Sequence, residues 1–117
     1  MSELLRAVVS VRLFTDRKCF GPGIAELLRR VDEHHSLRAA AQSMEMAYSK
    51  AWTIMKNAEN GLGCKLLTSS TGGKNGGGAE LTDDARRILA AYERCCEKLR
   101  ERADELLAEE FAFYTEK

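Results

Sequence analysis

The sequence lacks long apolar runs, a secretory signal and a net charge. No apolar stretch approaches the roughly 20 residues that a membrane-spanning helix needs, so we expect no membrane association. The first residues, Met1 to Arg6, have neither the basic flank nor the apolar centre of a signal peptide, which predicts a cytoplasmic protein. Lys and Arg together number 18, and so do Asp and Glu. A net charge of zero argues against a nucleic-acid-binding protein unless the charges are unevenly placed.

The cysteines follow no metal-binding or redox spacing. There are four, and none forms a C-x-x-C pair: Cys19, Cys64, Cys95 and Cys96. We therefore expect reduced thiols and no structural disulfide. Cys95 and Cys96 leave a redox switch open, but Cys96 falls on an apolar seam, which favours buried and inert thiols. His34 and His35 share no paired ligand spacing with the cysteines, so we expect no metal and no cofactor.

Length and charge distribution indicate one domain with two differently charged parts. A chain of 117 residues has room for a single modest core. Residues 1–79 carry 11 Lys and Arg against 7 Asp and Glu, a balance of +4, whereas residues 80–117 carry 7 against 11, a balance of −4. We expect the basic part to bind DNA and the acidic part to pair with another protein.

Two helices are predicted first in the basic part. Pro22 suits the first turn of a helix that ends near His34 and His35. Ser36 is a natural N-cap for a second, short helix from Leu37 to Ser43. The alanines at 39–41 have almost no side-chain bulk, so another helix can pack closely against them.

A third helix is predicted from about Ala47 to Asn60, with Gly61 or Gly63 ending it. Its inward-facing residues are expected to be Ala51, Trp52, Met55 and Ala58. Because the triple-alanine helix faces Trp52, we expect this side chain to pack in the core rather than to stack on a base. Two helices joined by a break of three or four residues are typical of a helix-turn-helix.

Short strands are predicted around the helices. Val8 to Phe14 is β-branched and partly alternating, which favours a strand. Cys64 to Thr68 and Ala79 to Leu81 are expected to pair as a β-hairpin. The glycine-rich residues 69–78 between them do not match the Walker spacing of nucleotide-binding loops, so we interpret them as the basic tip, or wing, of the hairpin.

Thr82 is expected to cap a long final helix whose first turn holds Asp83 and Asp84. Apolar residues recur in it at alternating four- and three-residue spacing, broken only by Glu110: Ala85, Leu89, Tyr92, Cys96, Leu99, Ala103, Leu106 and Phe113. So long a seam would be exposed on a monomer, which predicts a homodimer. The predicted interface residues are Leu89, Tyr92, Cys96, Leu99, Ala103 and Leu106.

The sequence therefore predicts a mainly α (α+β) fold, a winged helix-turn-helix with a long C-terminal dimerisation helix. Residues 1–81 would form the DNA-binding part and residues 82–117 the dimerisation helix of the same unit. In a helix-turn-helix the second helix enters the major groove. The candidate DNA-binding residues are Ser36, Arg38, Ala47, Tyr48, Ser49, Lys50, Thr53 and Lys56, with Lys74 and Asn75 in the wing. The alternative for Ser49 and Lys50 is the solvated face of an amphipathic helix.

Several of these segments together resemble one family. They are Phe20-Gly21-Pro22-Gly23, Ser36-Leu37 with the alanines at 39–41, Met46-x-Tyr48 with Ala51-Trp52, Leu62-Gly63, and the glycine wing from Thr71 to Ala79 followed by Leu81-Thr82. From about Val8 to Tyr92 the chain is similar to the N-terminal DNA-binding domain of the molybdate-dependent (ModE-type) transcriptional regulators, which is related to the winged helix of LysR-type regulators. The resemblance implies a bacterial transcription regulator that dimerises through its first and last helices.

The chain departs from the family pattern at a few positions. His35 and Glu45 stand where the family usually has glycine, Ala47 replaces the usual capping serine, and Ala85 replaces a common glycine. Family members also carry C-terminal oxyanion-binding domains, and this sequence ends at Lys117. We therefore expect no molybdate sensing by this polypeptide, and any effector-sensing partner protein is unknown.

The leading hypothesis is a homodimeric regulator that binds double-stranded DNA and is not an enzyme. Helix 47–60 would enter the major groove, and wing 69–78 would contact the minor groove or the backbone. Zero net charge also permits an adaptor that keeps the dimer helix but does not read DNA. A third hypothesis, an oxidoreductase or metal enzyme that uses the cysteines, requires bound metal or thiol-dependent activity.

Overall fold

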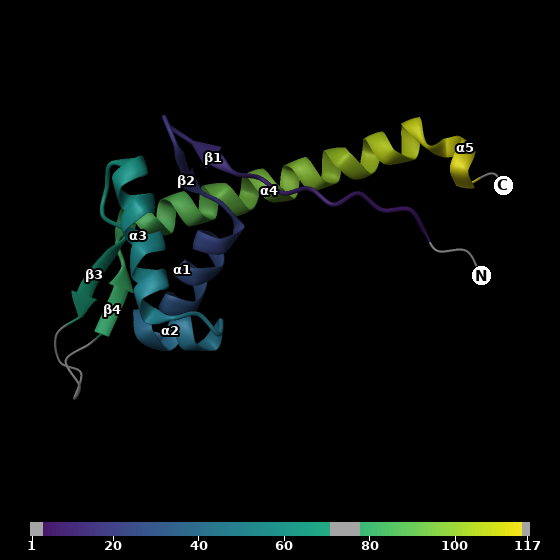
Figure 1. The fold of residues 1–117 in the computed structure, drawn as a ribbon. Helices are drawn as coiled ribbons and strands as arrows, with labels where there is room; N and C mark the ends of the chain where they lie inside the picture. Colours follow the sequence, from purple (N-terminus) through teal and green to yellow (C-terminus); the bar gives the residue numbers. More distant parts are fainter. Residues whose placement is uncertain (1–3, 71–77, 116–117) are drawn as a thin grey trace.

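The computed structural model describes residues 4–70 and 78–115. Its elements are, in chain order, β1 (Leu13–Phe14), β2 (Lys18–Phe20), α1 (Pro22–His34), α2 (Leu37–Ser43), α3 (Tyr48–Leu62), β3 (Leu67–Ser70), β4 (Gly78–Leu81), α4 (Asp83–Glu110) and α5 (Ala112–Thr115). In Figure 1, α1, α2 and α3 form one body with the β3–β4 hairpin beside it, and α4 projects far beyond that body. The predicted fold class, a winged helix-turn-helix with a long C-terminal helix, is confirmed.

The boundaries of α1 and α2 follow from local capping. Pro22 occupies the first turn of α1, and His35 ends that helix in the left-handed conformation, with φ 57°. The Ser36 hydroxyl accepts a hydrogen bond from the N–H of Ala39 at 3.0 Å, which satisfies a first-turn donor of α2. The predicted helix from Leu37 to Ser43 is therefore confirmed at both ends.

Two residues with side chains adopt a backbone conformation that favours glycine. They are His35, with φ 57°, and Glu45, with φ 54°. Together with Ala85, these are the positions at which the sequence has another residue where the resembled family usually has glycine. The backbone turn after α1 and the turn between α2 and α3 therefore keep their left-handed geometry although a Cβ makes that geometry less favourable.

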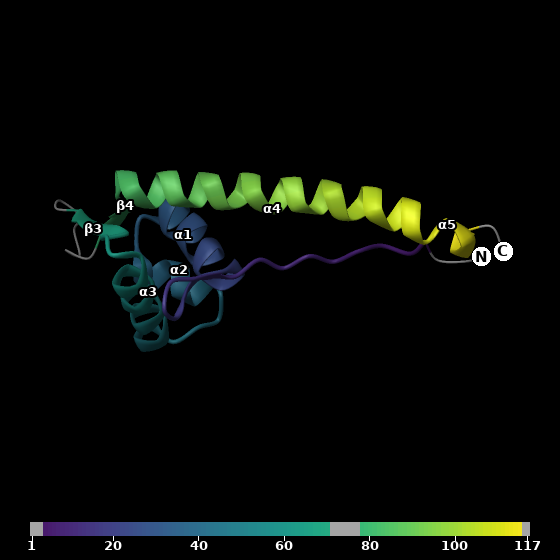
Figure 2. The same cartoon turned by 90° about the horizontal axis from the view of Figure 1, so that it is seen from above.

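The predicted strands differ from the observed ones at their ends. Of the segment from Val8 to Phe14, only Leu13 and Phe14 pair, with β2 as partner. Residues 4–12, here called the N-terminal arm, run extended beside α4 in both Figure 1 and Figure 2. β3 begins at Leu67 rather than Cys64. The Leu66 N–H donates to the Glu59 carboxylate at 2.8 Å instead of to a strand, although the Leu66 carbonyl still accepts from the N–H of Thr82, opposite it in the register, at 3.0 Å.

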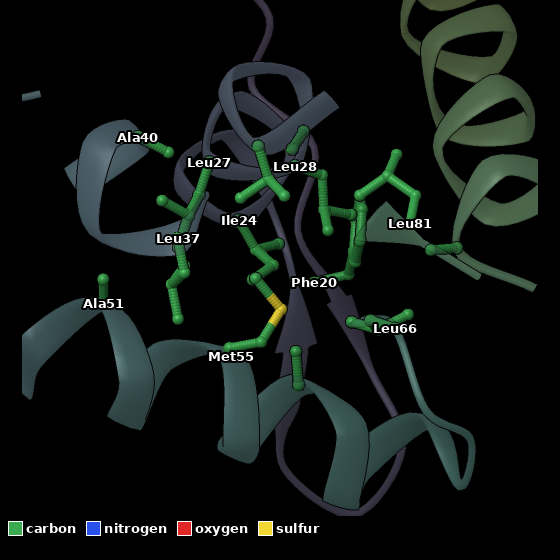
Figure 3. Packing of buried hydrophobic residues seen from close by; sticks show 14 of the residues in the cluster. Phe20, Ile24, Leu27, Leu28, Leu37, Ala40, Ala51, Met55, Leu66 and Leu81 are labelled. Atoms are coloured by element: carbon green, nitrogen blue, oxygen red, sulfur yellow. The ribbon is translucent and has the colours of Figure 1, made fainter. Parts of the chain in front are cut away.

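The core lies where the three helices of the body meet the hairpin. The largest wholly buried side chains are Phe20, Leu27, Leu28, Leu66 and Val31. Figure 3 shows the α1 side chains directed between α2 and α3 on one side and towards Leu66 and Leu81 on the other. Because α1 is apolar towards all of these elements, it is the central element that positions α3 and the hairpin against each other.

The first half of α4 is bound to the body. The Thr82 hydroxyl accepts from Ala85 N–H at 3.0 Å, which confirms the predicted cap. Tyr92 packs edge-on against Phe20, with 5.0 Å between ring centroids, and its hydroxyl donates to the carbonyl of Val11 at 2.7 Å. Ion pairs from Arg86 to Asp32 (2.9 Å) and from Arg29 to Glu93 (2.6 Å) also join α4 to α1.

Beyond these contacts α4 continues away from the body towards α5, as Figure 2 shows from above. Of the described residues, those of the N-terminal arm run alongside this outer part. Among the described residues, no helix is both long enough and apolar enough to cross a membrane.

The C-terminal end of α3 lies so close to β2 that only glycine fits at position 61. A Cβ at Gly61 would overlap the Cβ of Cys19, and it would lie 3.4 Å from the Cys19 Cα. We expect Gly61→Ala to destabilise the fold by about 1–3 kcal/mol, because this overlap involves backbone-attached atoms that cannot rotate away. Urea denaturation measures the change.

Gly23→Ala is the matched control, since a Cβ at Gly23 meets nothing within 4 Å. Both glycines lie in helices, so alanine should favour each helix by up to about 1 kcal/mol in the absence of a clash. If Gly61→Ala and Gly23→Ala change the free energy of unfolding equally, α3 does not approach β2 as closely as described.

Candidate nucleic-acid interface

The turn between α2 and α3 is held by backbone hydrogen bonds to the end of α2. Met44 and Met46 N–H both donate to the Ala41 carbonyl, at 3.0 and 2.9 Å, and Glu45 N–H donates to Gln42 at 3.0 Å. Ala40 and Ala41 of α2 and Ala51 of α3 are fully buried. The expected close approach of another helix to the triple-alanine helix is thereby confirmed, and it determines which face of α3 is exposed.

The exposed face of α3 carries most of the predicted contact residues. Ser49, Lys50 and Thr53 are exposed, and Lys56 is half-buried. The Thr53 hydroxyl donates to the Ser49 carbonyl at 3.0 Å, so it is turned back onto its own helix. Ala47 caps the helix without a side-chain acceptor, which leaves the first-turn N–H groups available at the positive end of the helix dipole.

Trp52 was expected in the core, and the structure contradicts this. Its side chain is 49% exposed, whereas its neighbours Ala51 and Met55 are buried. The reason is geometric: Ala51, Met55 and Ala58 already fill the space that α3 shares with α1 and α2. Trp52 lies outside this buried cluster.

Two aromatic rings on α3 each have a cation above them. The Arg38 guanidinium lies 4.3 Å from the centroid of the Tyr48 ring, and the Lys56 ammonium lies 5.4 Å from that of Trp52. These four residues line a groove between α3 and the β3–β4 hairpin, together with residues such as Leu37, Thr68 and Ala79. We call it the α3 groove. Sequence reasoning predicted Arg38, Tyr48 and Lys56 here and missed Trp52.

Glu59 connects α3 to the start of the hairpin. It is the one buried charged residue in the described part of the chain, and its carboxylate accepts from the N–H groups of Leu66 (2.8 Å) and Leu67 (3.4 Å). The Lys56 ammonium lies 3.4 Å from its other oxygen. Burial acts to raise the pKa of Glu59, but the hydrogen bonds from the two backbone donors and Lys56 outweigh it and hold the pKa below its ordinary value.

The remaining predicted DNA-binding residues lie outside α3. The Ser36 hydroxyl is occupied as the cap of α2, whereas Arg38 is exposed at the groove. Lys74 and Asn75 lie outside the described residues. The β3–β4 register pairs Leu67 with Leu81 through to Ser70 with Gly78, so the predicted hairpin is present next to α3.

The predicted seam of α4 divides into two parts. Tyr92 is only 5% exposed, and burial is the first cause that raises the pKa of its hydroxyl to about 12. It belongs to the chain's own core, so its prediction as a contact with a second copy is corrected. Leu89 and Cys96 are half-buried against the same core. Leu99 and Leu106, 43% and 40% exposed, and the half-buried Ala103 lie further out.

The cysteines and histidines form no common site. All four cysteines are free, and Cys95 is exposed, which contradicts its prediction as a buried thiol. The described ranges, 4–70 and 78–115, contain no group of three or more His, Cys, Asp or Glu side chains placed to hold one metal ion.

Comparison with known proteins places the helix-turn-helix in a family. Residues 25–86 match the model of the bacterial regulatory helix-turn-helix proteins of the lysR family. The chain is 33% identical over 107 residues to the transcriptional regulator ModE of Haemophilus influenzae, covering 92% of this chain and 40% of that protein.

Two further relatives match shorter segments. The chain is 33% identical over 91 residues to the transcriptional regulator ModE of Yersinia pestis, covering 77% of this chain and 32% of the relative. It is 36% identical over 66 residues to the molybdenum-pterin-binding protein MopB of Rhodobacter capsulatus, covering 56% and 24%. The chain thus spans two fifths or less of these relatives. The family description is that of a regulator and not of an enzyme, as the sequence predicted.

Substitution of Glu59 should loosen the hairpin from α3. We expect Glu59→Ala to lower the free energy of unfolding by about 1–3 kcal/mol, because it leaves buried N–H donors without an acceptor. Glu59→Gln keeps an acceptor oxygen and should lose less. Urea denaturation of both variants measures these changes.

The effect of Glu59→Gln should depend on pH. Because the folded-state pKa lies below the ordinary 4.5, the charged carboxylate stabilises the fold above that pH, and this contribution disappears as the pH falls through the folded-state value. The difference between the native chain and Glu59→Gln should therefore shrink in acid. A difference that is constant from neutral pH to below 4.5 would contradict the assigned role of the charge.

Proposed function

The chain belongs to the bacterial regulatory helix-turn-helix proteins of the lysR family, and from this premise we propose that it binds double-stranded DNA sequence-specifically as a homodimer. Helix α3 would lie in the major groove, and the wing, residues 69–78, would contact the adjacent minor groove or backbone. The observation that carries the proposal is the outer face of α3, which the packing of its alanine face against α2 leaves exposed.

The chemistry of that face suits a duplex. Ser49 and Lys50 lie in the first turn, where a hydroxyl and an ammonium can reach phosphates or base edges. The uncapped N–H groups behind Ala47 present the positive end of the helix dipole, which favours a phosphate. Ala47 itself has too small a side chain to keep a backbone phosphate at a distance. Thr53 and Lys56 would extend the contact by one turn.

Arg38 and the wing would add contacts on either side of α3. Arg38 stands on the exposed side of α2 at the mouth of the α3 groove, within reach of the strand that borders the major groove. In Figure 1 the β3–β4 hairpin extends away from the body alongside α3. Lys74 and Asn75 lie between the two strands in sequence, so contacts from them would fall beside those of α3.

The outer half of α4 would form the dimer contact. Leu99 and Leu106 expose apolar area on a helix that no other part of the body covers, and apolar patches of this kind mark protein interfaces. Ala103 lies between them at seam spacing, and Leu89 and Cys96 would flank the contact near the body. The acidic balance of residues 80–117 would keep this part of the dimer away from DNA.

Selection of bound fragments from random duplex DNA with the full chain tests the function. We expect a palindromic consensus with half-sites about one helical turn apart, and an affinity that falls steeply with salt. The double variant Lys50→Glu with Lys74→Glu should bind more weakly, with a flatter dependence of log affinity on log salt, by about two units of slope for two lost phosphate contacts.

The matched control is Arg87→Glu with Arg94→Glu, which makes the same change of charge at two exposed positions of α4 that are not among the proposed DNA contacts. This control should bind DNA as the native chain does. If it loses as much DNA affinity as Lys50→Glu with Lys74→Glu, the attraction depends on overall charge and not on the proposed contacts. If the native chain shows no affinity for DNA even in dilute buffer while the dimer persists, the adaptor function is favoured instead.

The dimer has its own test. Leu99→Asp with Leu106→Asp should raise the dimer dissociation constant at least about 100-fold, because an unpaired carboxylate buried in an interface costs several kcal/mol. Sedimentation equilibrium of the full chain gives this constant. Arg87→Asp with Arg94→Asp places two aspartates on another face of α4, so it should leave the dimer dissociation constant unchanged. A dimer that tolerates the leucine substitutions must use another surface.

A further inference from the structure

We propose that Trp52 reads thymine in the DNA site by contact of its indole ring with the C5-methyl group in the major groove. The inference rests on the proposed DNA binding and adds to it a specificity-determining residue with a stated base preference. Its starting observation is that the one tryptophan of the chain lies on the outer face of α3, 49% exposed.

Core packing keeps this ring out of the interior, but no core contact covers its exposed half. Ala51 and Met55, on either side of Trp52 along the helix, supply the contacts with the core. The ring lies instead in the wall of the α3 groove, with the Lys56 ammonium 5.4 Å from its centroid. A tryptophan is the largest apolar side chain available, so leaving half of it in water is unfavourable unless a ligand covers it.

The charge next to the ring is already compensated. The ammonium of Lys56 lies 3.4 Å from the buried carboxylate of Glu59, and that carboxylate is fixed by backbone N–H donors of Leu66 and Leu67. Lys56 therefore carries less free positive charge towards a phosphate than Lys50 does. The indole of Trp52 is the large apolar surface in an otherwise polar groove wall.

The major groove offers one apolar group to such a surface. Guanine, cytosine and adenine present hydrogen-bond donors and acceptors there, and thymine adds a methyl group. An indole face over that methyl removes apolar area from water on both sides. Tyr48, one turn earlier and held by the Arg38 guanidinium at 4.3 Å, extends the apolar edge along the helix. The base opposite Trp52 is therefore assigned as thymine.

Deoxyuridine differs from thymidine only by this methyl group, so it tests the assignment directly. In the selected duplex each thymine is replaced singly by uracil, and the dissociation constants of the full-length native chain, Trp52→Ala and Trp52→Phe are measured. For the native chain we expect one position in each half-site at which uracil weakens binding about three- to fivefold, the worth of one buried methyl group. When uracil replaces this thymine in both half-sites, the fold-change in the dissociation constant should be the product of the two single fold-changes.

The variants separate the methyl contact from other roles of the ring. Trp52→Ala should bind thymine and uracil duplexes equally at that position, whereas Trp52→Phe should keep most of the difference, because it retains an apolar ring without the indole N–H. Lys50→Ala is the matched control on the same face: it should weaken binding to both duplexes and preserve their ratio. Thermal unfolding of Trp52→Ala verifies that the exposed side chain is not needed for folding.

The outcomes distinguish this inference from the proposed function. If the native chain binds duplex but no uracil substitution matters, or if Trp52→Ala keeps the native sensitivity, the thymine contact is refuted and DNA binding stands. If uracil has no effect on the native chain and Trp52→Phe still weakens binding, the indole N–H contacts a base acceptor, which thymine and uracil share, and the methyl contact is overturned. Equal affinity for single strands would show base stacking rather than groove reading. Absence of duplex binding by the native chain overturns both.

Discussion

The small-residue contact between α2 and α3 is the constraint on which the rest of the molecule depends. Ala40, Ala41 and Ala51 are fully buried where the two helices meet, so nothing larger than a methyl group fits between them. At the other end of α3, Gly61 approaches Cys19 closely enough to exclude a Cβ. Contact at both ends fixes the rotation of α3 about its axis. The side that presents Ser49, Lys50 and Trp52 is therefore determined by the residues on the opposite side.

A second set of contacts fixes α4 relative to this body. Tyr92 connects three segments, since its ring packs on Phe20 and its hydroxyl reaches the N-terminal arm at Val11. The exposed ion pairs of Arg29 and Arg86 each contribute little free energy, but they join α1 to the same half of α4 that Tyr92 holds against the body. As a result the outer half of α4 leaves the body at a defined angle. A dimer formed through it would hold two copies of α3 at a defined separation, which is what recognition of a two-fold DNA site requires.

Capping and glycine positions were predictable because they act within a few residues. Ser36 and Thr82 accept hydrogen bonds from the first turns of α2 and α4 as expected, and Gly63 ends α3 in the left-handed conformation. The strand predictions were less accurate. β-branched composition around Val8 predicted a strand, but pairing requires a neighbouring strand, and only Leu13 and Phe14 have one. In α3 the inward positions of Ala51, Met55 and Ala58 followed from their spacing, whereas the exposure of Trp52 did not.

The sequence by itself determined the helices, their order, the helix-turn-helix and the difference in charge between its two parts, because these follow from local hydrogen bonding, apolar spacing and composition. Only the tertiary structure decided how the apolar residues are shared among competing contacts. Trp52 and Tyr92 were both expected to be covered by apolar contacts, yet Trp52 is exposed and Tyr92 is buried in the chain's own core. The reason is that burial depends on which surface lies opposite: Tyr92 meets Phe20 and the N-terminal arm, whereas Trp52 lies in the wall of the α3 groove.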